Sequence, residues 1–144
     1  MTVLWARVGL AVSWLVSRAV LVWLLTGPQA WVGGDVSYFE ASLAVLDDVG
    51  PGQVLVEYPL PAVAVVALPW VAALVTGVSY ALVLLATAAL TDLAFTVLLA
   101  RGRSGSWPAA VWVLAVPALG ATAYARFDLL PGVLAGAATL AVLG

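Results

Sequence analysis

Five long apolar blocks take up most of this sequence and constrain its fold more than any other feature. They cover residues 8–26, 60–76, 80–100, 107–123 and 129–144. Hydrophobic residues make up 65% of the chain and charged residues only 8%, whereas a water-soluble domain carries about 25% charged residues. Because an apolar helix of roughly 20 residues crosses a bilayer, we predict an all-α, polytopic membrane protein with about five transmembrane helices. These helices are expected to form one membrane module over residues 1–144.

The residue types present in the chain exclude several classes of site. There is no Cys and no His, which excludes disulfides, thiolate catalysis, and zinc or haem sites built from those ligands. The five basic residues are outnumbered by seven acidic ones, so no basic surface for nucleic acid is expected. No cluster of carboxylates has the spacing of a metal site, and we expect neither a bound metal nor another cofactor.

The two ends of the chain each carry an apolar block with a second interpretation. Residues 8–26 are predicted to span the membrane, and the alternative is a cleaved signal peptide, because Arg7 precedes the block. No A-x-A cleavage pattern follows before Gly33, which favours a retained helix. The last block stops at Gly144 without a polar tail, so the chain is expected to be a fragment of a longer protein.

Residues 27–58 form the only long polar stretch, and most of the acidic residues lie in it. These are Asp35, Glu40, Asp47, Asp48 and Glu57. Apolar residues within the stretch recur at helical spacing, at Val36, Phe39, Leu43 and Leu46. We therefore predict a short amphipathic helix that lies along the membrane surface. The sequence Gly50-Pro51-Gly52 is expected to end it.

Two acidic residues of this loop are candidates for chemistry. Asp35 follows a Gly pair and could act as a general base at the membrane surface, or it could only cap the helix that follows. Glu57 and Tyr58 come directly before Pro59 at the start of the second block, which could place Glu57 opposite Asp35 across one cleft. The alternative is that Tyr58 is an interfacial anchor beside a solvated acid.

Two charged residues lie near the middle of predicted spans. An unpaired charge there costs at least about 2.5 to 3.5 kcal/mol, so Arg18 and Asp92 are expected to face protein or water rather than lipid. Since both lie at similar depth, we predict that they pair with each other, although Asp92 could instead be protonated.

Arg126 and Asp128 lie between the last two blocks and have two interpretations. An Arg at this bend could hold a phosphate group bidentately. The structural alternative is that Asp128 caps the final helix while Arg126 extends to the lipid headgroups.

The arginine residues do not decide the orientation of five crossings. Arg7 and Arg126 would lie on one side of the membrane, and Arg101 and Arg103 on the other. Either another feature sets the orientation, or one apolar block does not fully cross. If one block does not fully cross the membrane, we expect it to lie within residues 60–100.

The order of three short motifs resembles that of a known enzyme family. The motifs are Gly33-Gly34-Asp35-Val36-Ser37-Tyr38, then Glu57-Tyr58-Pro59-Leu60-Pro61, then Tyr124-Ala125-Arg126-Phe127-Asp128. Together they resemble the amino-terminal part of GT-C-type membrane glycosyltransferases, in particular glycosyltransferase family 87, the polyprenol-phosphate-mannose-dependent mannosyltransferases. The chain would then be a partial GT-C module.

The resemblance implies a function and a location. Asp35 would be the catalytic carboxylate, in a loop over residues 27–58 that lies outside the cytoplasm, and the protein would reside in the cell membrane. The donor would be a polyprenyl-phosphate sugar, with mannose the expected sugar, and the acceptor a glycan or glycolipid. The substrate-binding residues would be Tyr38, Glu57, Tyr58, Arg126 and Asp128.

The sequence also departs from the family. Its members often have Tyr-Pro-Pro where this chain has Tyr58-Pro59-Leu60-Pro61, which leaves the role of Glu57 uncertain. Many GT-C enzymes carry an acidic pair, whereas Asp35 stands alone here, so metal dependence is not expected. Family members have more spans than this chain, so it is expected to need the missing carboxy-terminal spans for activity.

Two other classes of function stay open on the sequence alone. In a small transporter or channel subunit, Arg18 and Asp92 would line a pathway. In a structural or assembly membrane protein without a site, none of these residues would matter beyond folding.

Overall fold

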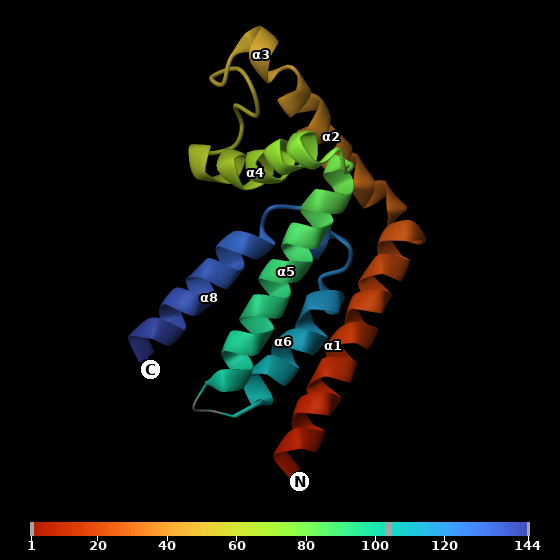
Figure 1. Ribbon diagram of the computed structural model, residues 1–144, viewed down its shortest axis with the longest axis vertical. Coiled ribbons are helices and arrows are strands. Elements are labelled where there is room, and N and C mark those ends of the chain that lie inside the picture. The colour runs from red at the N-terminus through yellow and green to blue at the C-terminus, as the bar shows by residue number, and fades with distance from the viewer. Residues whose placement is uncertain (1, 103–104, 144) are drawn as a thin grey trace.

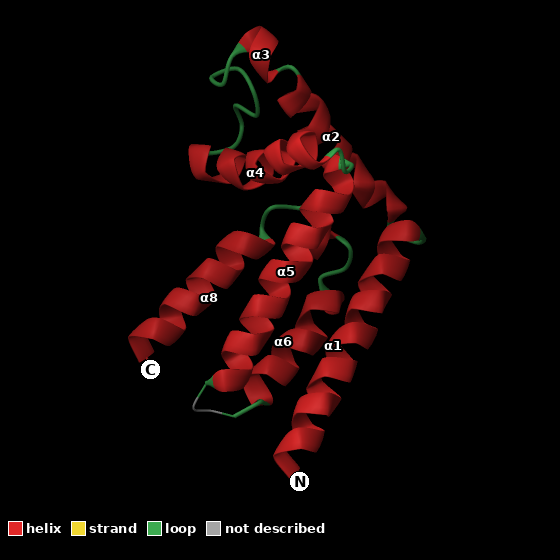
Figure 2. Cartoon of the chain, viewed as in Figure 1, coloured by secondary structure: helices red, strands yellow, loops and turns green. Residues whose placement is uncertain are grey.

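The computed structural model describes residues 2–102 and 105–143, and that part of the chain folds into helices joined by short loops, without strands (Figures 1 and 2). The prediction of an all-α fold is therefore confirmed. The elements are α1 (Thr2–Thr26), a 3-10 turn η1 (Ala30–Val32), α2 (Gly33–Ala44), α3 (Leu46–Val49), α4 (Leu60–Thr76), α5 (Tyr80–Arg101), α6 (Trp107–Ala118), α7 (Thr122–Ala125) and α8 (Leu129–Leu143). Arg103 and Gly144, which the sequence analysis considered, lie outside the described residues.

The apolar helices differ in length. Helices α1 and α5 are long and apolar enough to cross a membrane, whereas α4, α6 and α8 are shorter. The predicted span 107–123 is wrong at its end, because α6 has 12 residues and ends at Ala118. Pro117 and then Gly120, with φ 75°, prevent the helix from continuing. Since α6 rises only about 18 Å, it is shorter than the roughly 30 Å hydrocarbon core.

Helix α4 takes a different direction from the other apolar helices. In Figure 1, α1, α5 and α6 run along the long axis of the molecule, and α4 lies across the end of this bundle. The turn from α4 into α5 depends on Gly77, which adopts the left-handed conformation with φ 71° and donates its N–H to the carbonyl of Ala73. As a result, the start of α1, the end of α5 and the start of α6 lie at one end, and α2, α3 and α4 at the other (Figure 1).

The predicted amphipathic helix is broken into α2 and α3, and its apolar face contacts protein. Val36, Phe39 and Leu43 are buried in a core that includes Val66 of α4 and Leu84 of α5. The prediction of one helix is therefore wrong, and its position along the membrane surface stays a prediction. Burial against neighbouring helices removes the same apolar area from water without lipid.

Two glycines permit the close contacts that position the remaining helices. A Cβ atom at Gly136 of α8 would lie 2.6 Å from the ring of Phe95 on α5, so α8 can pack this closely only with Gly there. At Gly120, a Cβ atom would lie 2.6 Å from Oε1 of Gln29. That same oxygen accepts a 2.7 Å hydrogen bond from the backbone N–H of Ala121. Gln29 thereby holds the start of α7 against the end of α1.

The outward faces of the apolar helices are themselves apolar. Exposed large side chains include Leu15 on α1, Leu68 on α4, Leu90 on α5, Leu114 on α6 and Leu134 on α8. A soluble monomer rarely exposes contiguous apolar surface on this scale. The distribution is typical of a surface that lipid or further protein covers.

Candidate functional site

Asp35 and Arg126 form an ion pair at the end of the bundle that carries α2. Nε of Arg126 donates to Oδ2 of Asp35 at 2.7 Å, although 91 positions separate the two residues along the chain. The side chains are 35% and 48% exposed, respectively, so a ligand can reach both. The N-cap of α2 is Val32, and Asp35 lies inside its first turn. Capping therefore does not account for the position of Asp35.

Tyr38 and Glu57 extend this site along α2. Tyr38 lies one helical turn after Asp35, and its hydroxyl donates to Oε1 of Glu57. This hydrogen bond lowers the pKa of Glu57 below its ordinary value and raises the pKa of Tyr38, because deprotonated Tyr38 would face a carboxylate. The contact with Tyr38 thus places Glu57 beside α2, the helix that carries Asp35. Both members of this pair are exposed.

Aromatic rings connect α2 to the segments before α4 and α8. The ring of Tyr58 meets Phe39 edge-on at 5.8 Å between centroids and Phe127 edge-on at 5.3 Å. Phe127 lies directly between Arg126 and Asp128. Edge-to-face pairs of this kind contribute about 0.5–1.5 kcal/mol each. They hold the Arg126 segment against α2.

The charges around Arg126 favour its cationic form. The hydrogen bond and charge of Asp35 raise the pKa of Arg126, and the charge of Asp128 adds to the effect. Asp128 is exposed and directly precedes α8. Arg126 is therefore a permanent cation with a carboxylate on one side.

An apolar pocket lies on another side of Arg126. It has a volume of about 160 Å³ and is enclosed by α4, α5 and α8. Leu68, Leu84 and Leu130 line it together with Arg126 and Phe127. The arrangement places a cation between a carboxylate and a hydrocarbon surface, which suits a ligand with a phosphate group and an apolar chain.

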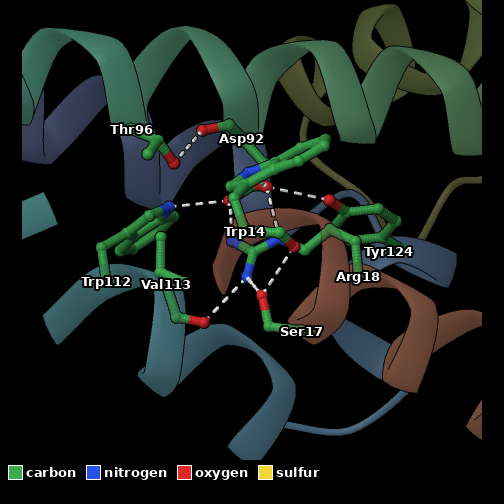
Figure 3. A network of polar contacts seen from close by, with 8 residues as sticks. All are labelled: Trp14, Ser17, Arg18, Asp92, Thr96, Trp112, Val113 and Tyr124. Carbon is green, nitrogen blue, oxygen red and sulfur yellow. Dashed lines mark hydrogen bonds and ion pairs between the residues drawn. The ribbon is translucent and has the colours of Figure 1, made fainter. Parts of the chain in front are cut away.

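Arg18 and Asp92, the two charges within the predicted spans, pair with each other between α1 and α5 (Figure 3). Nη2 of Arg18 lies 2.5 Å from Oδ1 of Asp92, and Nε lies 2.7 Å from Oδ2. This is the bidentate geometry that makes Arg–carboxylate pairs strong. Asp92 is 0% exposed and Arg18 is 6% exposed.

Three further side chains donate to the carboxylate of Asp92, as Figure 3 shows. The indole N–H groups of Trp14 on α1 and Trp112 on α6 each donate at 2.7 Å, and the hydroxyl of Tyr124 on α7 donates at 2.9 Å. Asp92 therefore joins four helices through one carboxylate. With so many donors already in place, the carboxylate has little capacity to bind a passing ion.

Nη1 of Arg18 is also satisfied within the protein. It donates to Oγ of Ser17 at 2.7 Å and to the carbonyl of Val113 at 2.8 Å. Among the described residues, no buried side-chain N or O atom lacks a hydrogen-bond partner. A saturated, buried network is typical of a structural element. This geometry favours a structural role for Arg18 and Asp92 over a transport pathway.

Sequence reasoning missed several residues of both clusters. Trp14 lies four positions before Arg18, so helical spacing already placed the two on one face. No comparable signal linked Trp112 to Asp92, or Phe39 to Tyr58, because these contacts depend on how separate helices pack.

No group of three or more Asp or Glu residues is placed to hold a metal ion within residues 2–102 and 105–143. Comparisons of the chain with protein-family models, curated proteins and solved structures find no match. The site must therefore be interpreted from its own geometry.

Proposed function

We propose that this chain is the amino-terminal module of a membrane glycosyltransferase that uses a polyprenyl-phosphate sugar, mannose being the expected sugar. One observation carries the proposal: Arg126 contacts the carboxylate of Asp35 and also lines the apolar pocket between α4, α5 and α8. A phosphate at Arg126 would have a hydrocarbon surface beside it for the polyprenyl chain. The sugar attached to that phosphate would then lie near Asp35.

The reaction assigns one role to each charged group. Asp35 takes the proton from an acceptor hydroxyl while that oxygen forms a bond to the anomeric carbon of the sugar. The bond between the anomeric carbon and the phosphate oxygen breaks, and polyprenyl phosphate leaves with the bonding electrons. Arg126 stabilises the charge on this leaving group. Its Nε donates to Asp35, and the N–H groups on its other two nitrogens would bind the phosphate.

The exposed tryptophans support a membrane position for the bundle. Trp5 on α1 and Trp107 on α6 are exposed at one end, and Trp23 and Trp31 at the other. Along α1, Trp5 and Trp23 are separated by about 27 Å, close to the hydrocarbon thickness of roughly 30 Å. Exposed Trp at two levels is typical of the aromatic belts at membrane–water interfaces.

The positions of the charged residues support one orientation in the membrane when α4, which lies across the bundle, is not counted as a crossing. Arg7 and Arg101 then fall at one end, and Arg126 at the other with all acidic residues except Asp92. This arrangement favours the end with Arg7 and Arg101 as the arginine-rich one. Under the positive-inside rule that end is cytoplasmic. Asp35 would then face the extracytoplasmic side, as a lipid-linked donor requires.

Thiol labelling tests this orientation. The chain has no Cys, so Gln53→Cys at the acidic end and Ser106→Cys at the start of α6 introduce single, exposed probes. In intact cells, a membrane-impermeant thiol reagent is expected to label Gln53→Cys but not Ser106→Cys. Ser106→Cys is expected to be labelled only after the membrane is permeabilised. Labelling of Ser106→Cys alone in intact cells would place Asp35 in the cytoplasm and overturn the proposed function.

Donor binding tests the site itself. Arg126→Gln is expected to weaken binding of a polyprenyl-phosphate sugar to the purified protein by about tenfold or more, since a charge-assisted hydrogen bond contributes about 1.5–3 kcal/mol. Arg126→Lys, which keeps the charge, is expected to lose less of the donor-binding affinity than Arg126→Gln. The matched control is Glu40→Gln, which removes one exposed charge from α2 without changing Arg126. Equal binding by Arg126→Gln and the unmodified chain would contradict the proposal.

A further inference from the structure

A second and larger pocket lies at the other end of the bundle from Asp35. Its volume is about 770 Å³, and it is lined by α1, α5 and the residues just before α6. This is the size of a pocket that holds a drug-sized molecule. Its walls are largely apolar and include Leu10, Leu15 and Val97, and Trp14 of the Asp92 network also lines it. The proposed glycosyltransferase reaction does not use this pocket.

Two arginines give the pocket a positive charge. Arg7 of α1 and Arg101, in the last turn of α5, both line it and are both exposed. The ion pairs found in residues 2–102 and 105–143 involve Arg18 and Arg126 instead. No acidic residue is among those that line the pocket. The site therefore combines an apolar interior with cations from two different helices.

We propose that this pocket binds an anionic phospholipid. One acyl chain packs against the apolar walls, and the phosphate is held by Arg7 and Arg101. A guanidinium group binds phosphate with two parallel hydrogen bonds, and two guanidinium groups match a headgroup with net negative charge. A zwitterionic headgroup carries its own cation, which the same arginines repel.

The position of the pocket along the bundle suits a lipid. Exposed Trp5 and Trp107 lie at the same end of the molecule, where aromatic side chains mark the membrane interface. Arg7 is two positions from Trp5, so its side chain reaches headgroup level. The pocket continues from there along α1 toward Trp14, in the direction of the hydrocarbon core. A lipid with its headgroup at Arg7 would follow this path.

Native mass spectrometry of the full chain tests the proposal. The protein is released from micelles that contain equal amounts of phosphatidylglycerol and phosphatidylcholine, and the bound lipid is identified by its mass. Phosphatidylglycerol is expected to be retained preferentially. The double variant Arg7→Gln/Arg101→Gln is expected to reduce this adduct by at least about tenfold, because each arginine near an anionic lipid contributes to binding. Arg7→Lys/Arg101→Lys is expected to retain most of it.

A second pair of variants separates the pocket from general surface binding. Ala11→Trp places a large side chain in the pocket, and Ala19→Trp places the same side chain on an exposed position of α1 outside it. Only Ala11→Trp is expected to displace the lipid. Equal retention of both lipids, or loss in both tryptophan variants, would overturn the proposal. The proposal would also be overturned if the protein were a dimer and Ala11→Trp converted it to a monomer without changing the bound lipid. A second copy of the chain would then be the occupant of the pocket.

Discussion

The variant Asp92→Asn is expected to lose about 3–5 kcal/mol of stability, because it leaves Arg18 charged and buried without its counter-charge. Asn has nearly the same size as Asp, so the effect does not depend on a cavity. The measurement is the thermal unfolding of the detergent-solubilised protein, followed by circular dichroism. Asp47→Asn is the matched control, because it removes the same charge from an exposed position on α3. Its effect should stay within about 0.5 kcal/mol.

A second substitution distinguishes charge burial from a simple packing effect. Arg18→Met removes the buried cation, so Arg18→Met combined with Asp92→Asn is expected to be more stable than Asp92→Asn alone. Reversal of the two charges is not expected to restore stability, because an Arg at position 92 would face the N–H and O–H donors of Trp14, Trp112 and Tyr124. Wild-type stability in Asp92→Asn would show that the ion pair does not hold the four helices together.

The network illustrates which part of the fold could be predicted from the sequence. A charge in an apolar span has a large cost, so the presence of one basic and one acidic residue at similar depth already indicated a pair. The limits of two helices were also readable: the predicted block 60–76 coincides with α4, and the block 80–100 ends one residue before α5 does. Apolar length and flanking Pro or Gly residues carry that information locally.

The direction of α4 could not be predicted in the same way. Its composition fits a membrane span as well as that of α5 does, and the reason it lies across the bundle is its packing against α2 and α5. The ion pair of Asp35 with Arg126 could not be predicted from the sequence either. Each residue was a candidate by itself, but their contact depends on the aromatic ring of Tyr58 between Phe39 and Phe127. Such contacts come from tertiary packing, which hydrophobic periodicity does not encode.

The catalytic part of the proposed function predicts a loss of sugar transfer without a loss of donor binding. Asp35→Asn removes the group that accepts a proton, while its amide oxygen can still accept the hydrogen bond from Nε of Arg126. Since general base catalysis contributes about 10²–10⁴-fold, transfer from a radiolabelled polyprenyl-phosphate sugar is expected to fall by that factor. The measurement compares the variant with the unmodified chain in membranes that contain equal amounts of protein, each chain being produced together with the further spans that the proposed enzyme needs for activity.

Two controls make this result specific to Asp35. Glu40→Gln changes an exposed carboxylate of the same helix, and its transfer rate is expected to match the wild type. Glu57→Gln weakens the contact with Tyr38 and is expected to lower transfer less than Asp35→Asn, because Glu57 does not contact the reacting oxygen in the proposed reaction. Unchanged transfer by Asp35→Asn would remove Asp35 from the mechanism. Donor binding without transfer in the unmodified chain, with those further spans present, would limit its function to holding the lipid-linked sugar.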